Sequence, residues 1–166
     1  MRLNSYVYFG IAAVCFSLIG AAVYMQLALD MLPCPLCVLQ RYAFIGTGLF
    51  ALIAGVQNSV RRPATALALA SALGGASVAA KHLYVLANPA TSCGIDPLET
   101  GLNKIFLADW LPAVFRADGL CDTPYAPILG LSIPGWTMVW YCLMSIVLLV
   151  LLLQKNRPVS IFSDAR

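Results

Sequence analysis

The chain has 166 residues, of which 61% are hydrophobic and only 10% are charged. Soluble domains carry roughly 25% charged residues, so this composition excludes an ordinary soluble globular protein. The formal net charge of +3 comes from basic residues that flank apolar runs, so it reports on membrane topology and gives no support for nucleic-acid binding.

Four apolar runs have the length of about 20 residues that a helix needs to cross the hydrocarbon core of a bilayer. They cover residues 6–29, 38–57, 64–86 and 135–153. The first run follows Arg2, as a signal peptide would, but its apolar core is longer than the signal-peptide range of about 7–15 residues. We therefore predict an all-α membrane protein, a four-transmembrane-helix bundle that forms a single domain over residues 1–166.

The basic residues near the predicted spans are distributed unequally between the two sides of the membrane. One side carries six of them, against three on the other, and Lys81 lies inside or near the end of the third span. The six are Arg2, Arg61, Arg62, Lys155, Arg157 and Arg166; the three are Arg41, Lys104 and Arg116. The positive-inside rule then predicts that both termini are cytoplasmic. The loops at 30–37 and 87–134 would face the opposite, oxidising compartment, where disulfides persist.

A CxxC motif, Cys34-Pro35-Leu36-Cys37, stands at the start of the second span. Pro35 suits the first turn of a helix, which places Cys34 near the N-cap and Cys37 in the first turn. The pKa of a thiol falls at a helix N-terminus and beside a cation, and Arg41 follows Cys37 by one turn. We predict that Cys37 is a reactive thiolate and that Arg41 is functional; an arginine that only extends to the membrane surface is the alternative.

The second loop contains a predicted short amphipathic helix that lies on the membrane surface. Asp96-Pro97-Leu98-Glu99 has the pattern of a helix N-terminus, and Pro112 would end the helix. The apolar residues at helical spacing are Leu98, Leu102, Ile105, Phe106 and Trp110.

Two more cysteines, Cys93 and Cys121, lie in the same loop and are 28 residues apart. With Cys34 and Cys37 they permit three disulfide pairings, and the sequence does not choose among them. A structural zinc site is disfavoured because it normally needs two close ligand pairs, and the single histidine, His82, lies towards the membrane. We therefore predict no metal. A static Cys93–Cys121 disulfide remains an alternative to an exchanging one.

The remaining two cysteines, Cys15 and Cys142, lie within the first and fourth spans. Buried thiols in apolar surroundings behave as small hydrophobic residues, so we expect both to be inert packing residues.

A thiol pair at a membrane surface needs an electron acceptor, and a lipid-soluble quinone diffuses in the same phase. Arg41 could donate a hydrogen bond to a quinone oxygen and stabilise the negative charge that develops on reduction. Placement alone supports this expectation, because the sequence contains no local quinone signature.

These features together resemble the DsbB family of bacterial inner-membrane thiol:quinone oxidoreductases, and the resemblance covers essentially the whole chain. It is carried by the four spans, by the run Cys34-Pro35-Leu36-Cys37-Val38-Leu39-Gln40-Arg41 and by the cysteine pair of the second loop. Further matching positions are Trp110-Leu111-Pro112, Val114-Phe115, Leu129-Gly130-Leu131, Pro134 and Trp136. The set is ordered along the chain, which makes it far more specific than a lone CxxC.

The resemblance implies a relay through four cysteines. Cys93 would form a mixed disulfide with a periplasmic DsbA-like thioredoxin-fold oxidase, and Cys121 would resolve it and exchange with Cys34. Cys37 would face the quinone, ubiquinone or menaquinone, with Arg41 holding the ring. Such a relay would sustain disulfide bond formation during protein folding in the periplasm.

Two positions depart from the family pattern. Gln40 stands where family members carry an acid, which alters the electrostatics near Arg41. His82 lies near a family histidine associated with the quinone site, although its distance from Cys93 differs, and a helix-end role is the alternative.

A close rival is a paralogue that serves a dedicated partner. An enzyme of the vitamin K epoxide reductase type is disfavoured, because in that family the CxxC comes late in the bundle. A non-enzymatic membrane scaffold or small transporter with a disulfide-stapled loop is also disfavoured, because it leaves the spacing of the CxxC and Arg41 unexplained.

Overall fold

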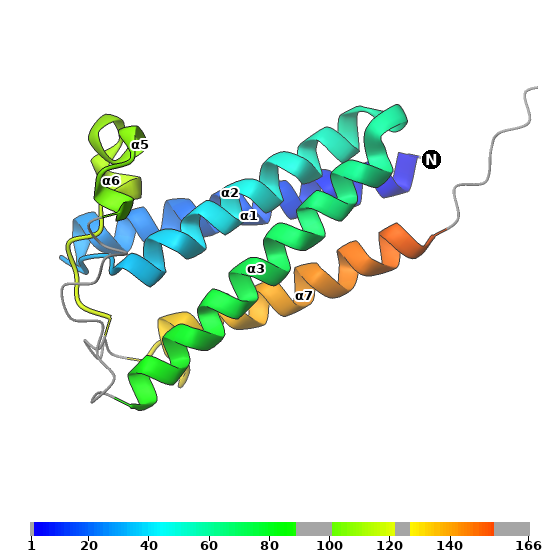
Figure 1. The fold of residues 1–166 in the computed structure, drawn as a ribbon. Helices are drawn as coiled ribbons and strands as arrows, with labels where there is room; N and C mark the ends of the chain where they lie inside the picture. The colour runs from blue at the N-terminus through cyan, green and yellow to red at the C-terminus, as the bar shows by residue number, and fades with distance from the viewer. Residues whose placement is uncertain (1, 89–100, 122–126, 155–166) are drawn as a thin grey trace, which may run out of the picture.

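The computed structural model describes residues 2–88, 101–121 and 127–154. Four long helices dominate it: α1 (Arg2–Ala28), α2 (Pro35–Val56), α3 (Arg61–Ala87) and α7 (Ile133–Leu153) (Figure 1). All four are long and apolar enough to cross a membrane, which confirms the predicted all-α four-helix membrane fold. Each helix begins two to four residues before the predicted apolar run, because capping and first-turn residues such as Pro35 add little hydropathy.

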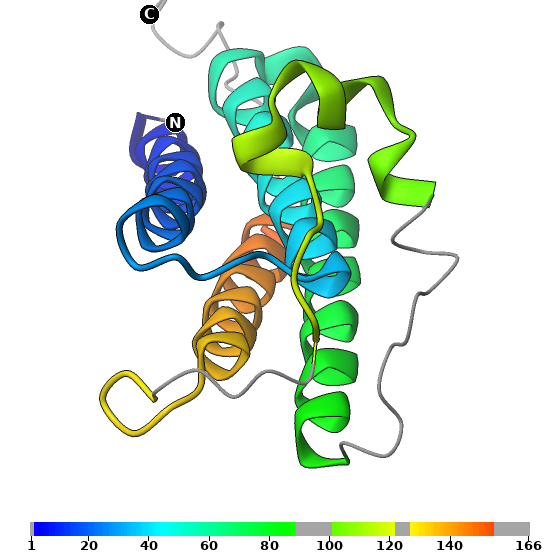
Figure 2. The same cartoon turned by 90° about the vertical axis from the view of Figure 1, so that its left-hand side faces the viewer.

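The helices form a bundle in which α2 packs against α1 and α3, and α3 packs against α7 (Figure 2). Close approach of α3 to α7 depends on small residues, since the ring of Tyr141 lies where a Cβ on Gly75 would stand. The same ring stacks on Phe44 of α2 with centroids 4.2 Å apart. Its hydroxyl donates a 2.6 Å hydrogen bond to the carbonyl of Gln40, so Tyr141 joins three helices.

The bundle end that carries the start of α1 is fixed by polar contacts. A 3₁₀ turn, η1 (Asn58–Val60), connects α2 to α3 there. Arg61 is buried and donates hydrogen bonds to the carbonyl of Ala54 and the hydroxyl of Ser5, each 3.0 Å long. Its guanidinium also lies 5.8 Å from the centroid of the Tyr8 ring. Arg61, used above only as a topology marker, is therefore also a structural residue.

The opposite end carries two short helices of the second loop, α5 (Phe106–Trp110) and α6 (Pro112–Phe115). Residues 101–103 are helical, but the backbone leaves the helix at 104–105 before α5 begins. The expected surface helix is thus interrupted within the described residues, and its predicted start at 96–99 lies outside them. Asn103 explains part of the break, because its amide exchanges two 2.9 Å hydrogen bonds with the backbone of Ala117.

The first and second loops are joined by backbone hydrogen bonds. The carbonyl of Pro33 accepts the N–H groups of Asp118 at 3.1 Å and Gly119 at 3.0 Å. A Cβ on Gly119 would collide with the carbonyl of Leu32, so this close approach requires glycine. The junction fixes residue 121 against the start of α2, which is where the site lies.

Candidate thiol site

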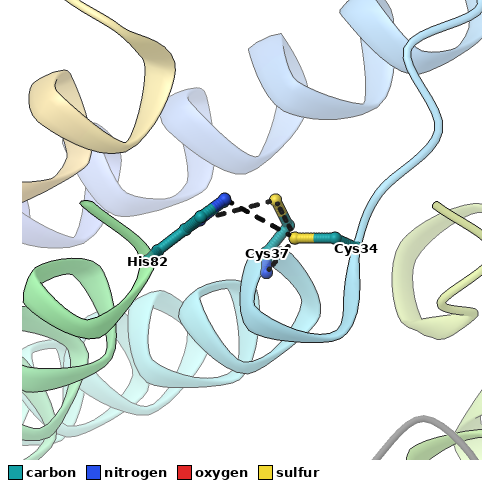
Figure 3. Close-up of side chains that lie close together, drawn as sticks. All are labelled: Cys34, Cys37 and His82. Atoms are coloured by element: carbon teal, nitrogen blue, oxygen red, sulfur yellow. Dashed lines mark hydrogen bonds between the residues drawn. The ribbon is translucent and has the colours of Figure 1, made fainter. Parts of the chain in front are cut away.

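Cys34 is the N-cap residue of α2, with Pro35 in the first turn as predicted. Its Sγ accepts a 3.4 Å hydrogen bond from the backbone N–H of Cys37, as the side chain of an N-cap residue does. The Cys34 thiol donates to the Cys37 Sγ across 3.0 Å, and both are free thiols (Figure 3). The two sulfurs can therefore join in a disulfide without refolding the helix.

His82 on α3 faces both sulfurs (Figure 3). Its Nε2 lies 3.8 Å from the Cys34 Sγ, and its Nδ1 lies 4.0 Å from the Cys37 Sγ. The side chain is only 5% exposed. Sequence spacing gives no indication of this contact, because Cys34 and His82 are 48 residues apart and are brought together by the packing of α2 on α3.

Cys121 from the second loop completes a cluster of three described cysteines. It is buried with Cys34, Leu36 and Val85 in one small apolar cluster. Hydrogen bonds with Cys121 and with Cys37, together with burial, raise the pKa of the Cys34 thiol. The structure therefore brings Cys34, Cys37 and Cys121 together, while Cys93 lies outside the described residues.

Arg41 lies one turn after Cys37 along α2, and its side chain is 6% exposed, so it is held inside the protein. Its Nη1 donates to the Oε1 of Gln26 at 3.0 Å. The same nitrogen donates to the carbonyls of Ala113 at 3.1 Å and Val114 at 3.0 Å. Arg41 thus links α1 and α2 to α6. Gln26 was missed by the sequence analysis, although a glutamine inside an apolar run is itself a signal for an interhelical hydrogen bond.

A cavity of about 650 Å³ opens beside these side chains. Residues of α1, α2, α3 and α7 line it, and the lining includes Cys37, Arg41 and His82. Most of the other lining residues are apolar, including the aromatic side chains Phe44, Trp136 and Trp140. Its volume lies within the range of roughly 300–1,000 Å³ that is usual for small-molecule sites.

Gln40, the position that departs from the family pattern, also lines this cavity and is 4% exposed. Its Oε1 accepts a 3.2 Å hydrogen bond from the hydroxyl of Thr137 on α7. Its Nε2 has no hydrogen-bond partner among the residues that the structure describes. A neutral amide at this position leaves Arg41 without a carboxylate from the same helix turn.

The two cysteines inside the spans differ from each other. Cys15 is buried and its thiol lies 3.5 Å from the sulfur of Met144, as expected of a packing residue. Cys142 is exposed on the surface of α7, so the expectation that it is buried packing is wrong. Its neighbour Tyr141 faces the bundle, which turns Cys142 outward because adjacent helix positions differ by about 100°.

Comparison with known proteins agrees with the geometry. Residues 4–151 match the family model described as "Disulfide bond formation protein DsbB". "Disulfide bond formation protein B" of Ralstonia nicotianae is 44% identical over 158 residues, covering 95% of this chain and 99% of the relative. The protein of the same name from Cupriavidus metallidurans is 46% identical over 158 residues, with 95% and 98% coverage. "Disulfide bond formation protein B 1" of Pseudomonas putida is 48% identical over 147 residues, with 87% and 86% coverage.

Proposed function

Because the chain belongs to the DsbB family of disulfide bond formation proteins, we propose that it oxidises a periplasmic DsbA-like dithiol partner and passes the electrons to a membrane quinone. The observation that carries the proposal is the convergence of Cys34, Cys37 and Cys121 beside a mainly apolar cavity. The cavity wall includes Cys37, so the thiol relay and a lipid-soluble acceptor can meet there.

The order of the relay is the one that the family resemblance implies, and it includes Cys93, which lies outside the described residues. A partner thiolate attacks the Cys93–Cys121 disulfide and, after resolution, the partner leaves oxidised with the loss of two electrons and two protons. The released Cys121 thiolate attacks Cys34, and the Cys34–Cys37 bond breaks. Cys37 is the better leaving group, because it stands in the first turn of α2, whereas the pKa of Cys34 is raised. The Cys93 thiolate then attacks Cys121, which re-forms the Cys93–Cys121 disulfide and leaves Cys34 and Cys37 as the reduced pair, whose two electrons and two protons would go to the acceptor.

The residues of the cavity fit a quinone. Its ring would lie against apolar and aromatic side chains, and its carbonyl oxygens accept hydrogen bonds, for which Arg41 and His82 supply donors. A bound quinone supplies a two-electron acceptor. Such an acceptor is needed, since a DsbA-type disulfide lies near roughly −120 mV and a structural disulfide near roughly −300 mV is about six decades too weak to oxidise it.

We also propose that the chain lies in the bacterial inner membrane with the thiol site on the periplasmic side. The support is the distribution of basic residues, six against three, which favours cytoplasmic termini.

The proposal is tested by mixing the purified chain anaerobically with a reduced DsbA-like protein and a soluble quinone. Loss of one quinone per dithiol oxidised, absent in Cys37→Ser and retained in Cys15→Ala, is the expected result. Oxidation of the partner that never depends on quinone would refute the acceptor. Function that survives both Cys34→Ser and Cys37→Ser would favour a scaffold with a stapled loop.

A further inference from the structure

The fold brings a third potential metal ligand to the CxxC motif. One donor atom each from Cys34, Cys37 and His82 lies within 4.8 Å of the others (Figure 3). Two thiolates and one imidazole are the ligands that zinc prefers in proteins. We propose that the reduced chain binds a single Zn²⁺ or similar soft cation through these three side chains, and that the chain with a Cys34–Cys37 disulfide does not.

The distances are close to those of a zinc site. With Zn–S of about 2.3 Å and Zn–N of about 2.0 Å, tetrahedral ligands stand about 3.8 Å apart for two sulfurs and about 3.5 Å apart for sulfur and nitrogen. The two sulfurs are 3.0 Å apart, Nε2 of His82 lies 3.8 Å from the Cys34 sulfur, and its Nδ1 lies 4.0 Å from the Cys37 sulfur. A zinc ion takes only one of these nitrogens, and one ring nitrogen lies within 4.8 Å of both sulfurs. Side-chain shifts of about 1 Å, together with a turn of the imidazole ring, bring the two sulfurs and that nitrogen to coordination distances.

The environment gives the site three protein ligands and an open side. Cys34 and His82 are buried, Cys37 is half-buried, and all three line the cavity. Three protein ligands with a fourth position open to water or substrate is the arrangement of catalytic zinc sites, whereas a structural zinc, which the sequence disfavours, is enclosed by four ligands. The reversibility of binding at this site comes from the redox chemistry of its two thiolates.

Binding depends on the redox state because the ligands are thiolates. Each cysteine loses one proton when it binds the ion, so two protons are released and no electrons move. A disulfide has no thiolate to offer, so forming the Cys34–Cys37 bond removes both sulfur ligands at once. A bound ion would in turn keep both thiols from forming a disulfide. That inhibitory consequence rests on the proposed function, whereas the binding itself does not.

Binding is measured on the purified full chain in detergent, reduced and anaerobic, by zinc titration against a chromophoric chelator. Cadmium titration gives a second readout, the thiolate-to-metal charge-transfer absorbance. We expect one ion per reduced chain and none after the Cys34–Cys37 pair has been oxidised. His82→Ala should weaken zinc affinity by about a hundredfold or more. Removing a residue that only hydrogen-bonds a metal ligand already lowers metal affinity by about 10–100-fold, and removing the ligand itself should cost at least as much. His82→Cys should restore tight binding.

Two controls assign the metal to these side chains. The double variant Cys15→Ala, Cys142→Ala should bind as the unmodified chain does, and so should Cys93→Ser, Cys121→Ser. Zinc that is retained by Cys34→Ser or Cys37→Ser, or lost from the Cys93→Ser, Cys121→Ser variant, would overturn the proposal. Equal binding to the oxidised and reduced chains would also overturn it.

A separate arm measures turnover. Zinc added to the reduced chain should slow quinone-dependent oxidation of the partner, and a chelator should restore it. Absence of any turnover in metal-free chain would refute the proposed function and leave the binding result standing.

Discussion

Gly119→Ala tests whether the junction between the two loops presents Cys121 to Cys34. The added Cβ would collide with the carbonyl of Leu32, so the loops must separate. Separation breaks the two hydrogen bonds that the Pro33 carbonyl accepts from Asp118 and Gly119. At about 1 kcal/mol each, their loss disfavours the docked loop by about 2 kcal/mol, or roughly thirtyfold.

The assay is a single turnover. Oxidised chain is mixed with a reduced partner, quenched with acid and alkylated, and free thiols are counted by mass spectrometry over time at Cys37, which the attack on Cys34 releases, and at Cys121, which that attack consumes. Transfer from Cys121 to Cys34 should slow by about thirtyfold in Gly119→Ala. Gly101→Ala is the matched control, because it lies in the same loop and its added Cβ would meet no atom within 4 Å. Equal rates for Gly119→Ala and the unmodified chain, or an equal loss in Gly101→Ala, would refute the reasoning.

Three further predictions concern packing, quinone use and pH. Gly75→Ala should lower the free energy of unfolding by about 1–3 kcal/mol, because the Tyr141 ring occupies the space that the added Cβ needs. Gly74→Ala is the control and should be tolerated, because its added Cβ would meet no atom within 4 Å. Equal midpoints of thermal unfolding in detergent for the two variants would contradict this packing. Arg41→Lys should raise the quinone KM about tenfold and the partner KM by less, since lysine cannot reproduce the planar hydrogen-bond donors of the guanidinium. Steady-state kinetics with each substrate varied in turn measures both values, and an unchanged quinone KM would contradict the prediction. The pKa of the Cys34 thiol is raised, so Cys34 should stay protonated and unreactive to iodoacetamide at pH values above about 8.5, where an ordinary thiol is largely thiolate. An alkylation rate of Cys34 that reaches half its maximum at or below about pH 8.5 would contradict this prediction.

Sequence patterns were sufficient for the spans and for the local geometry of the CxxC. Length and hydropathy determine which segments can cross a membrane, and a proline after Cys34 indicates the N-terminus of α2. Both signals are local, so they do not depend on how the helices pack.

What could not be predicted depends on rotation and contact between helices. The position of His82 beside the sulfurs needs the packing of α2 on α3, and the outward orientation of Cys142 needs the rotation of α7. The contacts of Arg41 with α6 join positions more than 70 residues apart in sequence, with separations of 72 and 73. The interruption at 104–105 is explained in part by the tertiary contact between Asn103 and Ala117, which a helical periodicity in the sequence does not reveal.

The placement of Arg41 makes the cavity and the second loop thermodynamically linked. One nitrogen of its guanidinium holds the carbonyls of Ala113 and Val114, while the residue also forms part of the cavity wall. A cavity ligand that competes for that nitrogen makes docking of the second loop less favourable. Docking of the loop makes the binding free energy of the ligand less favourable by the same amount, because coupling between two binding equilibria is reciprocal. Affinity for a cavity ligand should therefore depend on whether the second loop is docked, and under the proposed function Arg41 would couple binding of the partner to binding of the quinone.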